Sequence, residues 1–278
     1  MELIKRLFKN SRIRVCVPIL FALVVVAISA PGIAPQNPFS TNSLQVCRPP
    51  SFEHLAGTDS FGRDIFSRVI FGLRISLIVA SLTSGIGASF GIIFGTIAVQ
   101  FKQLDNLIMR FMDALLAFPS IILALAIVAI LRPSLEGVVI ALSITYIPRM
   151  TRIVRGASIQ IMENEYVLAT RAIGSSNIRI TLKHILPNMA AEVIVQSSFM
   201  FATAILGEAV LSFLGAGPPP PSPSLGNILS EARDFIYLDP WMPIMPGVMI
   251  MIVVLTVNVL GDGLRDVLDP KVKSGTER

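Results

Sequence analysis

Residues 164–188, NEYVLATRAIGSSNIRITLKHILPN, form the longest polar passage between runs of sequence that are apolar enough to cross a membrane. Asn164 is a good N-cap, and Glu165 falls in a first helical turn, where the helix dipole favours an anion. Gly174 falls where a left-handed residue would end that helix. One of the two serines that follow can cap a second segment, which Pro187 is expected to stop. The passage therefore predicts two short helices.

One face of the first of these helices carries small and apolar side chains at helical spacing, namely Tyr166, Ala169, Thr170 and Ile173. Such a ridge can press into a groove on another protein. A solvated loop between two spans explains the same polarity, and from the physical chemistry alone the two interpretations are equally good.

The composition of the chain excludes a soluble domain of this size. Hydrophobic residues make up 53% of the 278 residues, charged residues make up 15%, and the mean hydropathy is +0.71. A net charge of +5 is found in some nucleic-acid-binding proteins, but here the basic residues lie between apolar runs and have no interleaved aromatic residues. The expected fold class is therefore an all-α membrane protein.

Six transmembrane helices are expected from the apolar runs. The first run is either a signal peptide or a retained anchor, and the Pro31-Gly32 pair that follows it is no clear cleavage site, which favours the anchor. The fourth helix must continue past Pro148, because the apolar residues before it cover only about 18 Å of a hydrocarbon core about 30 Å thick. The expected spans are 15–30, 75–101, 106–131, 136 to beyond Pro148, 189–214 and 242–260.

The distribution of positive charge orients these spans. Six spans place both ends of the chain on one side of the membrane. If that side is the cytoplasm, it holds seventeen of the 23 lysines and arginines, and the exterior holds the other six. Both termini and residues 164–188 are therefore predicted to be cytoplasmic. Cys16 and Cys47 then lie on opposite sides of the membrane, so no disulfide between them is expected.

Glycines at four-residue intervals mark the second span. Gly87, Gly91 and Gly95 share one helical face and let a neighbouring helix approach closely. The glycines here are no dinucleotide-binding fingerprint, because no strand precedes them and the final gap is wrong. We expect them to serve helix packing.

Two spans carry residues that could lie near a transport pathway. In the third span, Asp113 is expected to pair with Arg110, and Pro119 is expected to kink the helix. These residues form either a hinge beside the pathway or an ordinary charged helix end with a tolerated proline. In the fifth span, Glu208 can bind a cationic group of a ligand or hydrogen-bond to a neighbouring helix, and packing is the favoured role.

The first exterior segment contains HLAGTDSFGRD at residues 54–64. Its acids lack the ligand spacing of a calcium loop. Gly57 and Gly62 are expected to make turns, and Thr58 or Asp59 is expected to cap the helix that leads into the next span.

The second exterior segment begins with a proline-rich turn at residues 217–223. Residues 224–239 then predict an amphipathic helix that lies at the outer surface of the membrane. Pro240 and Trp241 follow it and are expected to form an interfacial anchor.

Sequence signatures of enzymes are missing. The chain has no G-x-x-x-x-G-K-[ST] phosphate loop, no G-x-S-x-G elbow, no H-E-x-x-H and no C-x-x-C. Its two histidines, His54 and His184, are expected on opposite sides of the membrane as ordinary polar residues. The chain is therefore not expected to be an enzyme or to bind a metal.

The passage at 164–188 resembles the cytoplasmic EAA loop of ABC importer permeases, in which a short coupling helix docks on the ATPase subunit. The E-A-A triplet, the glycine and the I-x-L-P ending of that loop correspond to residues 168–170, Gly174 and residues 184–187. Leu168 replaces the acid of the triplet, and Glu165 can supply a negative charge nearby. The resemblance implies an ATPase-coupling set made of Glu165, Tyr166, Ala169, Thr170, Arg171, Gly174 and Pro187.

Three further motifs resemble signatures of the dipeptide, oligopeptide and nickel branch of these importers. They are GTDSFGRD at residues 57–64, ILGEAVLSFLG at 205–215 and NVLGDGLRDVLDP at 258–270. The resemblance therefore covers nearly the whole chain from about residue 57, and it implies the type I ABC importer permease fold, as the second permease of the "C" type.

The resemblance also implies a domain division. A cytoplasmic N-terminus and the first transmembrane helix occupy residues 1–34, and an exterior, periplasmic segment occupies 35–73. A type-1 ABC transmembrane domain of five helices follows at 74–263, with the coupling loop at 156–188, and 264–278 form a cytoplasmic tail.

The function that the resemblance implies is ATP-driven import of dipeptides or oligopeptides across a bacterial inner membrane. The implied partners are a homologous second permease, an exterior substrate-binding protein and two cytoplasmic ATPases, which use ATP and magnesium, while this chain binds no cofactor and no nucleic acid. Nickel, metallophore or glutathione uptake is the alternative of the same kind. An autonomous proton-coupled transporter that uses Asp113, Glu192 or Glu208 as a relay is an alternative of another class, and a membrane scaffold without transport is a third.

Overall fold

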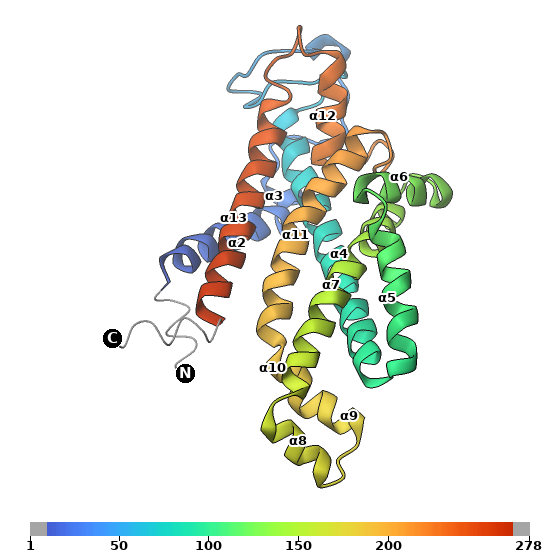
Figure 1. Cartoon of the computed structure of the whole chain (residues 1–278). Coiled ribbons are helices and arrows are strands. Elements are labelled where there is room, and N and C mark those ends of the chain that lie inside the picture. Colours follow the sequence, from blue (N-terminus) through green and yellow to red (C-terminus); the bar gives the residue numbers. More distant parts are fainter. Residues whose placement is uncertain (1–9, 269–278) are drawn as a thin grey trace.

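The computed structural model describes residues 10–268, and every regular element in that range is helical (Figure 1). Apart from a single bridge between Thr58 and Asp64, these residues contain no β-pairing. Residues 1–9, with three of the predicted cytoplasmic basic residues, and most of the predicted tail lie outside the described residues. The expected all-α fold class is confirmed.

Five long helices make up most of the molecule. They are α2 (Ser11–Ile28), α4 (Ile65–Gln100), α7 (Leu135–Met162), α11 (Ala190–Phe213) and α13 (Ile244–Leu268). α4 packs along α7, α11 packs against both α4 and α13, and α2 packs on α13 (Figure 1). Buried leucine, isoleucine, valine and alanine side chains fill the space between them, as expected for closely packed helices.

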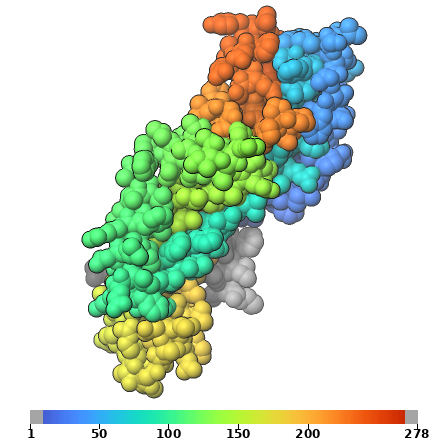
Figure 2. Space-filling model, turned by 90° about the vertical axis from the view of Figure 1, so that its right-hand side faces the viewer, coloured from blue at the N-terminus to red at the C-terminus, as the bar shows by residue number. Residues whose placement is uncertain are grey.

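Short helices connect the long ones. They are α3 (Ala30–Ile33), a 3₁₀ turn (Ser43–Gln45), α5 (Lys102–Leu116), α6 (Ser120–Leu131), α8 (Glu165–Ala172), α9 (Asn177–Ile180), a π-helical turn (Thr181–Ile185), α10 (Leu186–Asn188) and α12 (Leu225–Asp234). Figure 2 shows the resulting elongated shape, in which the segment around α8 and α9 projects at one end. The segment predicted to be the first exterior one and α12 lie at the other end, which is named the exterior end after that prediction.

The predicted third span is broken. The five long helices are each apolar enough to cross a membrane, and α5 and α6 add a sixth crossing only if they count together, because they meet at 93°. Pro119 stands at the N-cap of α6. Proline cannot donate the N–H that a continuous helix needs, and it drives the preceding residue out of the helical region. The expected kink is therefore a complete interruption.

The direction of the helices alternates along the chain. Figure 1 shows α4, α7 and α13 running one way and α5 and α11 running the other way. The first turn of α2 and the last turn of α13 meet, because Nη1 of Arg12 donates to Oδ2 of Asp266 at 2.9 Å. The described chain thus begins and ends at the same place.

Three predicted boundaries differ from the structure. α4 begins at Ile65, ten residues before the predicted start of the second span at 75, because the Asp64 carboxylate caps it by accepting from the N–H of Ser67 at 2.8 Å. The prediction that Thr58 or Asp59 caps this helix is therefore wrong. The predicted turn after α4 is reduced to the single residue Phe101, and α13 continues past 260.

The fourth span continues past Pro148, as predicted. α7 is 28 residues long and contains that proline without ending at it. Its length of about 42 Å exceeds the thickness of a hydrocarbon core, so its last turns extend beyond the apolar layer.

The glycines of α4 lie at helix contacts, as predicted. A Cβ atom on Gly95 would come within 2.6 Å of Cγ1 of Val154, and one on Gly91 would overlap the Met150 side chain, both on α7. Gly87 faces α11 instead, where its Cβ would lie 2.6 Å from the sulfur of Met200. One glycine face therefore serves two neighbouring helices.

The exterior end is a packed structure. Gly57 and Gly62 have φ angles of +78° and +69° and make the predicted turns. A Cβ on Gly57 would lie 2.6 Å from Nε1 of Trp241, and the partly buried Trp241 side chain packs against the protein core. The interfacial anchor expected at Pro240 and Trp241 stays a prediction. α12 buries Leu225 and Ile228 against α11, α13 and α4.

Candidate functional site

The end of α8 has the geometry that the sequence predicts. Gly174 has a φ angle of +89°; its N–H donates to the carbonyl of Arg171 at 2.9 Å, and the N–H of Ser175 donates to the carbonyl of Thr170 at 3.3 Å. These two bonds define a Schellman motif, which requires a left-handed residue after the helix. No atom outside the immediate backbone lies within 4 Å of a Cβ built on Gly174, so the requirement for glycine is conformational.

The start of α8 is simpler. Asn164 stands at the N-cap with an extended backbone, but its side chain makes no capping hydrogen bond. Glu165 lies in the first turn and Arg171 in the last, where each complements the helix dipole. The charge of the segment is therefore arranged to stabilise an isolated short helix.

α8 is attached to the segment that follows it. Val167 is fully buried in a cluster with Ile180 and Ile185. On an adjoining face of the helix, the rings of Tyr166 and His184 lie 5.8 Å apart between centroids, and Nδ2 of Asn188 donates to the Tyr166 hydroxyl oxygen at 3.2 Å. Because these contacts come from apolar, aromatic and polar groups on two faces, α8 and residues 177–188 form one unit.

The outer face of this unit is apolar and exposed. Ile173 is 86% exposed, and Tyr166 is 45% exposed. Of the ridge predicted on α8, Tyr166, Ala169 and Ile173 are exposed, whereas Thr170 is half-buried and its hydroxyl donates to the carbonyl of Tyr166 at 2.7 Å. Further exposed apolar side chains on the same lobe are Leu168, Ile178 and Leu182.

Pro187 does not stop the second segment. Ser176 caps α9, and the chain then remains helical through a π-helical turn and α10, which contains Pro187, up to a short break at Met189. A π turn shifts the hydrogen-bonding register by one residue, so the missing N–H of proline and its ring are accommodated. The prediction of a helix stop at Pro187 is wrong.

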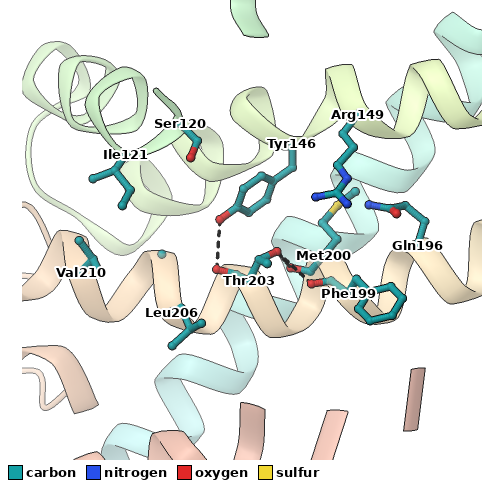
Figure 3. Close-up of a pocket in the computed structure, with 11 residues that line it drawn as sticks. Ser120, Ile121, Tyr146, Arg149, Gln196, Phe199, Met200, Thr203, Leu206 and Val210 are labelled. Carbon is teal, nitrogen blue, oxygen red and sulfur yellow. Dashed lines mark hydrogen bonds between the residues drawn. The ribbon is translucent and has the colours of Figure 1, made fainter. Parts of the chain in front are cut away.

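A groove lies between α7 and α11. Its cavity of about 270 Å³ is lined by Tyr146 and Arg149 from α7 and by Gln196, Phe199 and Thr203 from α11 (Figure 3). The Tyr146 hydroxyl donates to the Thr203 carbonyl at 3.1 Å, which ties the two helices together at one side of the cavity. In Figure 3 the guanidinium of Arg149 and the amide of Gln196 point toward each other.

A second cavity adjoins the first and extends along the same helices. It has a volume of about 540 Å³ and shares Arg149, Gln196 and Phe199 with the first cavity. Glu192 of α11 and Arg265 of α13 line its other part. Arg149 and Gln196 therefore stand where the two cavities join.

The predicted Asp113–Arg110 pair does not form. Oδ1 of Asp113 accepts from Nη2 of Arg152 on α7 at 2.6 Å, and both side chains are about half exposed. One turn further along α7, Arg155 makes a bidentate pair with Asp105 at 2.6 Å for both bonds. Lateral packing of α5 on α7 brings these partners together, which spacing within one helix cannot reveal.

Neither Asp113 nor Pro119 lines the groove, although the next residues after Pro119 do.

Glu208 is completely buried away from the two cavities. Its carboxylate accepts hydrogen bonds from the hydroxyls of Ser76 on α4 and Ser212 on α11, each at 2.7 Å. The favoured expectation, a hydrogen bond to a neighbouring helix, matches this geometry.

The exterior end contains an ionic cluster that the sequence alone did not reveal. Asp59 accepts from Nε of Arg63 at 2.7 Å and pairs with Arg68, and both arginines also pair with Glu231 of α12 at 2.6 Å. Asp59 and Arg68 are almost completely buried. Arg63 of the GTDSFGRD motif and Arg68 of α4 thus hold this end of the chain to α12, which follows them by more than 150 residues. Asp59 lies between the two arginines and pairs with both.

Asp239 lies beside this cluster. It is completely buried, Oδ1 accepts from the N–H of Met242 at 3.2 Å, and Oδ2 has no hydrogen-bond partner. Burial raises the pKa of Asp239 to about 6; the charge of Asp59 adds to the rise, and the hydrogen bond from Met242 opposes it.

The described histidines and cysteines form no metal centre. Within residues 10–268, no group of three histidine, cysteine, aspartate or glutamate side chains could hold a metal ion. Nδ1 of His54 lies 3.0 Å from Oδ1 of Asp64, so this histidine braces the cap of α4. Cys16 is buried in α2, Cys47 lies in the exterior segment, and both are free thiols.

Curated relatives match this chain along nearly its whole length. The dipeptide transport system permease protein DppC of Alkalihalophilus pseudofirmus is 46% identical over 274 residues, which are 98% of this chain and 90% of that protein. The glutathione transport system permease protein GsiD of Escherichia coli is 42% identical over 255 residues, or 90% of this chain and 84% of that protein.

A solved structure and a family model agree with this similarity. An inward-facing structure of the MetNI methionine ABC transporter covers 74% of this chain and 98% of the solved chain with a TM-score of 0.62; at 18% identity it shows the shared fold. The family model for the binding-protein-dependent transport system inner membrane component matches residues 87–274. With the projecting α8 unit and the apolar spans already described, these matches show that the chain belongs to this family of inner membrane transport components.

Proposed function

We propose that this chain is one permease subunit of an ATP-driven ABC importer that carries peptides, delivered by an exterior substrate-binding protein, across a bacterial inner membrane. The observation that carries the proposal is the α8 unit, a capped helix with an exposed apolar face on a chain of this family. The similarity to a dipeptide permease supports peptides as the ligand class.

The proposed partners are those of an ABC importer, and two surfaces of this chain support positions for them. Two cytoplasmic ATPases bind ATP and magnesium, and one of them receives the face formed by Tyr166, Ala169 and Ile173. A homologous second permease covers the open side of the groove between α7 and α11. In this proposal the chain itself binds no cofactor and catalyses no reaction. The excess of positive charge on the α8 side supports a cytoplasmic position for both termini.

Coupling would depend on the stiffness of the α8 unit. When the ATPases close on ATP, they move α8, and the buried Val167 and the Tyr166–His184 contact carry that movement into α7 and α11. Rigid transmission is reasonable because a packed and capped element shifts as a whole. Glu165, Arg171 and Pro187 would shape the unit, and Thr170 would support its exposed face.

Glutathione is the second candidate ligand, because a glutathione permease is nearly as similar to this chain as the dipeptide permease is. Nothing in the described groove favours nickel or a metallophore over these ligands. A proton relay in an autonomous transporter has less support: Glu208 is enclosed by two serine hydroxyls, and Asp113 is paired with Arg152.

Affinity purification of the tagged chain from native membranes tests the proposal. We expect a second permease and two ATPases to co-purify, and we expect ATP-dependent peptide uptake when they are reconstituted with the binding protein. In a background without Cys16 and Cys47, Ala169→Cys should crosslink to an ATPase, whereas Ser51→Cys on the exterior should not. Purification of the chain alone, with uptake driven by a proton gradient in the absence of ATP, would contradict the proposal.

A further inference from the structure

We propose that Arg149 is the binding site for a carboxylate group of the transported ligand. The inference rests on the proposed function, and it assigns to one residue of the groove the recognition of a chemical group that every peptide with a free C-terminus carries. Arg149 stands at the junction of the two cavities between α7 and α11, so a ligand that passes from one cavity to the other must pass its guanidinium.

The depth of Arg149 requires an explanation. It follows Leu135, the first residue of α7, by fourteen positions, which places it about 21 Å along the helix from the exterior end. A cation at that depth is costly in a bilayer unless it faces a water-filled cavity or meets an anion. Arg149 is exposed in the described chain and faces a cavity, which satisfies the first condition only.

The other arginines of α7 meet the second condition inside the chain. Arg152 pairs with Asp113, and Arg155 pairs with Asp105. Arg149 makes no ion pair or side-chain hydrogen bond with any of residues 10–268, even though Glu192 also lines the second cavity. Arg152, whose charge is neutralised within the chain, therefore lies one helical turn from Arg149, whose charge is free to bind a ligand.

The groups around Arg149 suit a carboxylate bound in transit. The guanidinium presents a planar fork of donors that matches the two oxygens of a carboxylate. Gln196, which is mostly buried and points toward Arg149, adds an amide donor from the facing helix (Figure 3). Phe199 and Met200 line the cavity beside them and offer apolar contact to side chains of differing shape. The Arg149 side chain is exposed in the described chain, so the guanidinium is free to bind a carboxylate and also to release it.

The tests use the complete importer in vesicles with its binding protein at saturating concentration and a radiolabelled dipeptide with a free C-terminus. In Arg149→Gln the KM for uptake should rise, or uptake at low ligand should fall, by at least about tenfold, because a charge-assisted hydrogen bond is lost. Arg149→Lys should recover part of the loss. Arg152→Gln is the matched control, since it removes a cation from the same helix without touching either cavity, and it should stay within about twofold of the original protein.

A histidine variant separates ligand recognition from a merely structural role. The imidazole is charged only below a pKa of about 6.5, so uptake by Arg149→His, relative to the original protein, should increase several-fold from pH 8 to pH 6. The same ratio should stay flat for Arg149→Gln. Co-purification of the second permease and the ATPases should be unchanged in all these variants.

Each contrary result has a defined meaning. Uptake by Arg149→Gln equal to that by Arg152→Gln would overturn the inference. It would also be overturned if Arg149→Lys were as impaired as Arg149→Gln and uptake by Arg149→His did not change with pH. Loss of assembly in Arg149→Gln would show that Arg149 pairs with an acid of another subunit, which also overturns it. If the original complex imports no peptide with ATP, the proposed function itself fails; in every other case a negative result concerns Arg149 alone.

Discussion

Asp239 lies in surroundings that disfavour its negative charge. Its carboxylate is completely buried and its pKa is raised to about 6. Because the pKa in the folded state is higher than the value of about 3.9 in an unfolded chain, the folded state binds the proton more tightly. The contribution of Asp239 to stability is therefore fully present below about pH 4 and is lost as the pH rises through about 6.

Asp239→Asn should remove this pH dependence. Asparagine keeps an oxygen that can accept the N–H of Met242, but it carries no charge at any pH. We expect the variant to be more stable than the original protein at pH 8, by up to about 3 kcal/mol, and similar to it at pH 4. Thermal unfolding of the purified chain in detergent between pH 4 and pH 8 measures the difference. The exposed Asp234→Asn is the control, and equal pH profiles for all three proteins would contradict the account.

Gly174 shows how one residue can control a docking element. A φ angle of +89° is costly for a β-branched side chain, by about 1–3 kcal/mol, although space is available around it. Gly174→Val should therefore unwind the end of α8 and weaken co-purification with the ATPases and uptake. Gly174→Asn should be milder, since asparagine tolerates left-handed backbone. Normal co-purification and uptake by the valine variant would mean that α8 is not the coupling element.

At the scale of the helices, the contact of α4 with α7 depends on the absence of side chains. Gly91→Leu would insert a side chain where Met150 already lies, and overpacking of this kind costs about 1–3 kcal/mol. We expect a lower thermal unfolding temperature and a lower yield of the complex. Gly85→Leu provides the matched control in the same helix, because nothing lies within 4 Å of a Cβ at that position. Equal stability of the two variants would refute the packing role of the glycine face.

The helices also show which parts of the structure a single sequence can predict. Residues Gly87, Gly91 and Gly95 share a face because of the helical repeat alone, and the left-handed end at Gly174 follows from local backbone preference. Asp113 pairs with Arg152 and not with Arg110, because α5 packs beside α7. The spacing of residues within one helix does not predict which helix will pack beside it. Pro119 signals an interruption, but the angle of 93° depends on what α6 packs against. Only the packing of α7 against α11 brings Arg149 beside Gln196, so a single sequence cannot predict the groove.

At the scale of the whole molecule, the exterior end is held together by charges that are distant in sequence. Glu231 is the only carboxylate of α12 that reaches Arg63 and Arg68 in the described chain, and both arginines are nearly buried. Removing one member of a buried ionic cluster leaves the remaining charges uncompensated, which is strongly destabilising.

Glu231→Gln should loosen the first exterior segment from α12. We expect a loss of about 3 kcal/mol in stability and faster cleavage of residues 34–64 by protease in detergent. Arg233→Gln, which removes one member of an exposed pair with Asp234, should leave both properties nearly unchanged. Protease resistance equal to that of the original protein would show that the segment is held by its apolar contacts instead.

The contact between Arg12 and Asp266 has a topological consequence for the described chain. Because α2 starts where α13 ends, the two ends of the described chain, residues 10 and 268, lie close together in space. A circular permutant, with a linker that joins the present ends and new ends in either predicted exterior segment, is expected to keep every helix contact described above. The helices of such a permutant would enter the membrane in a different order. Because their final arrangement is expected to stay the same, that arrangement would not depend on the order of insertion.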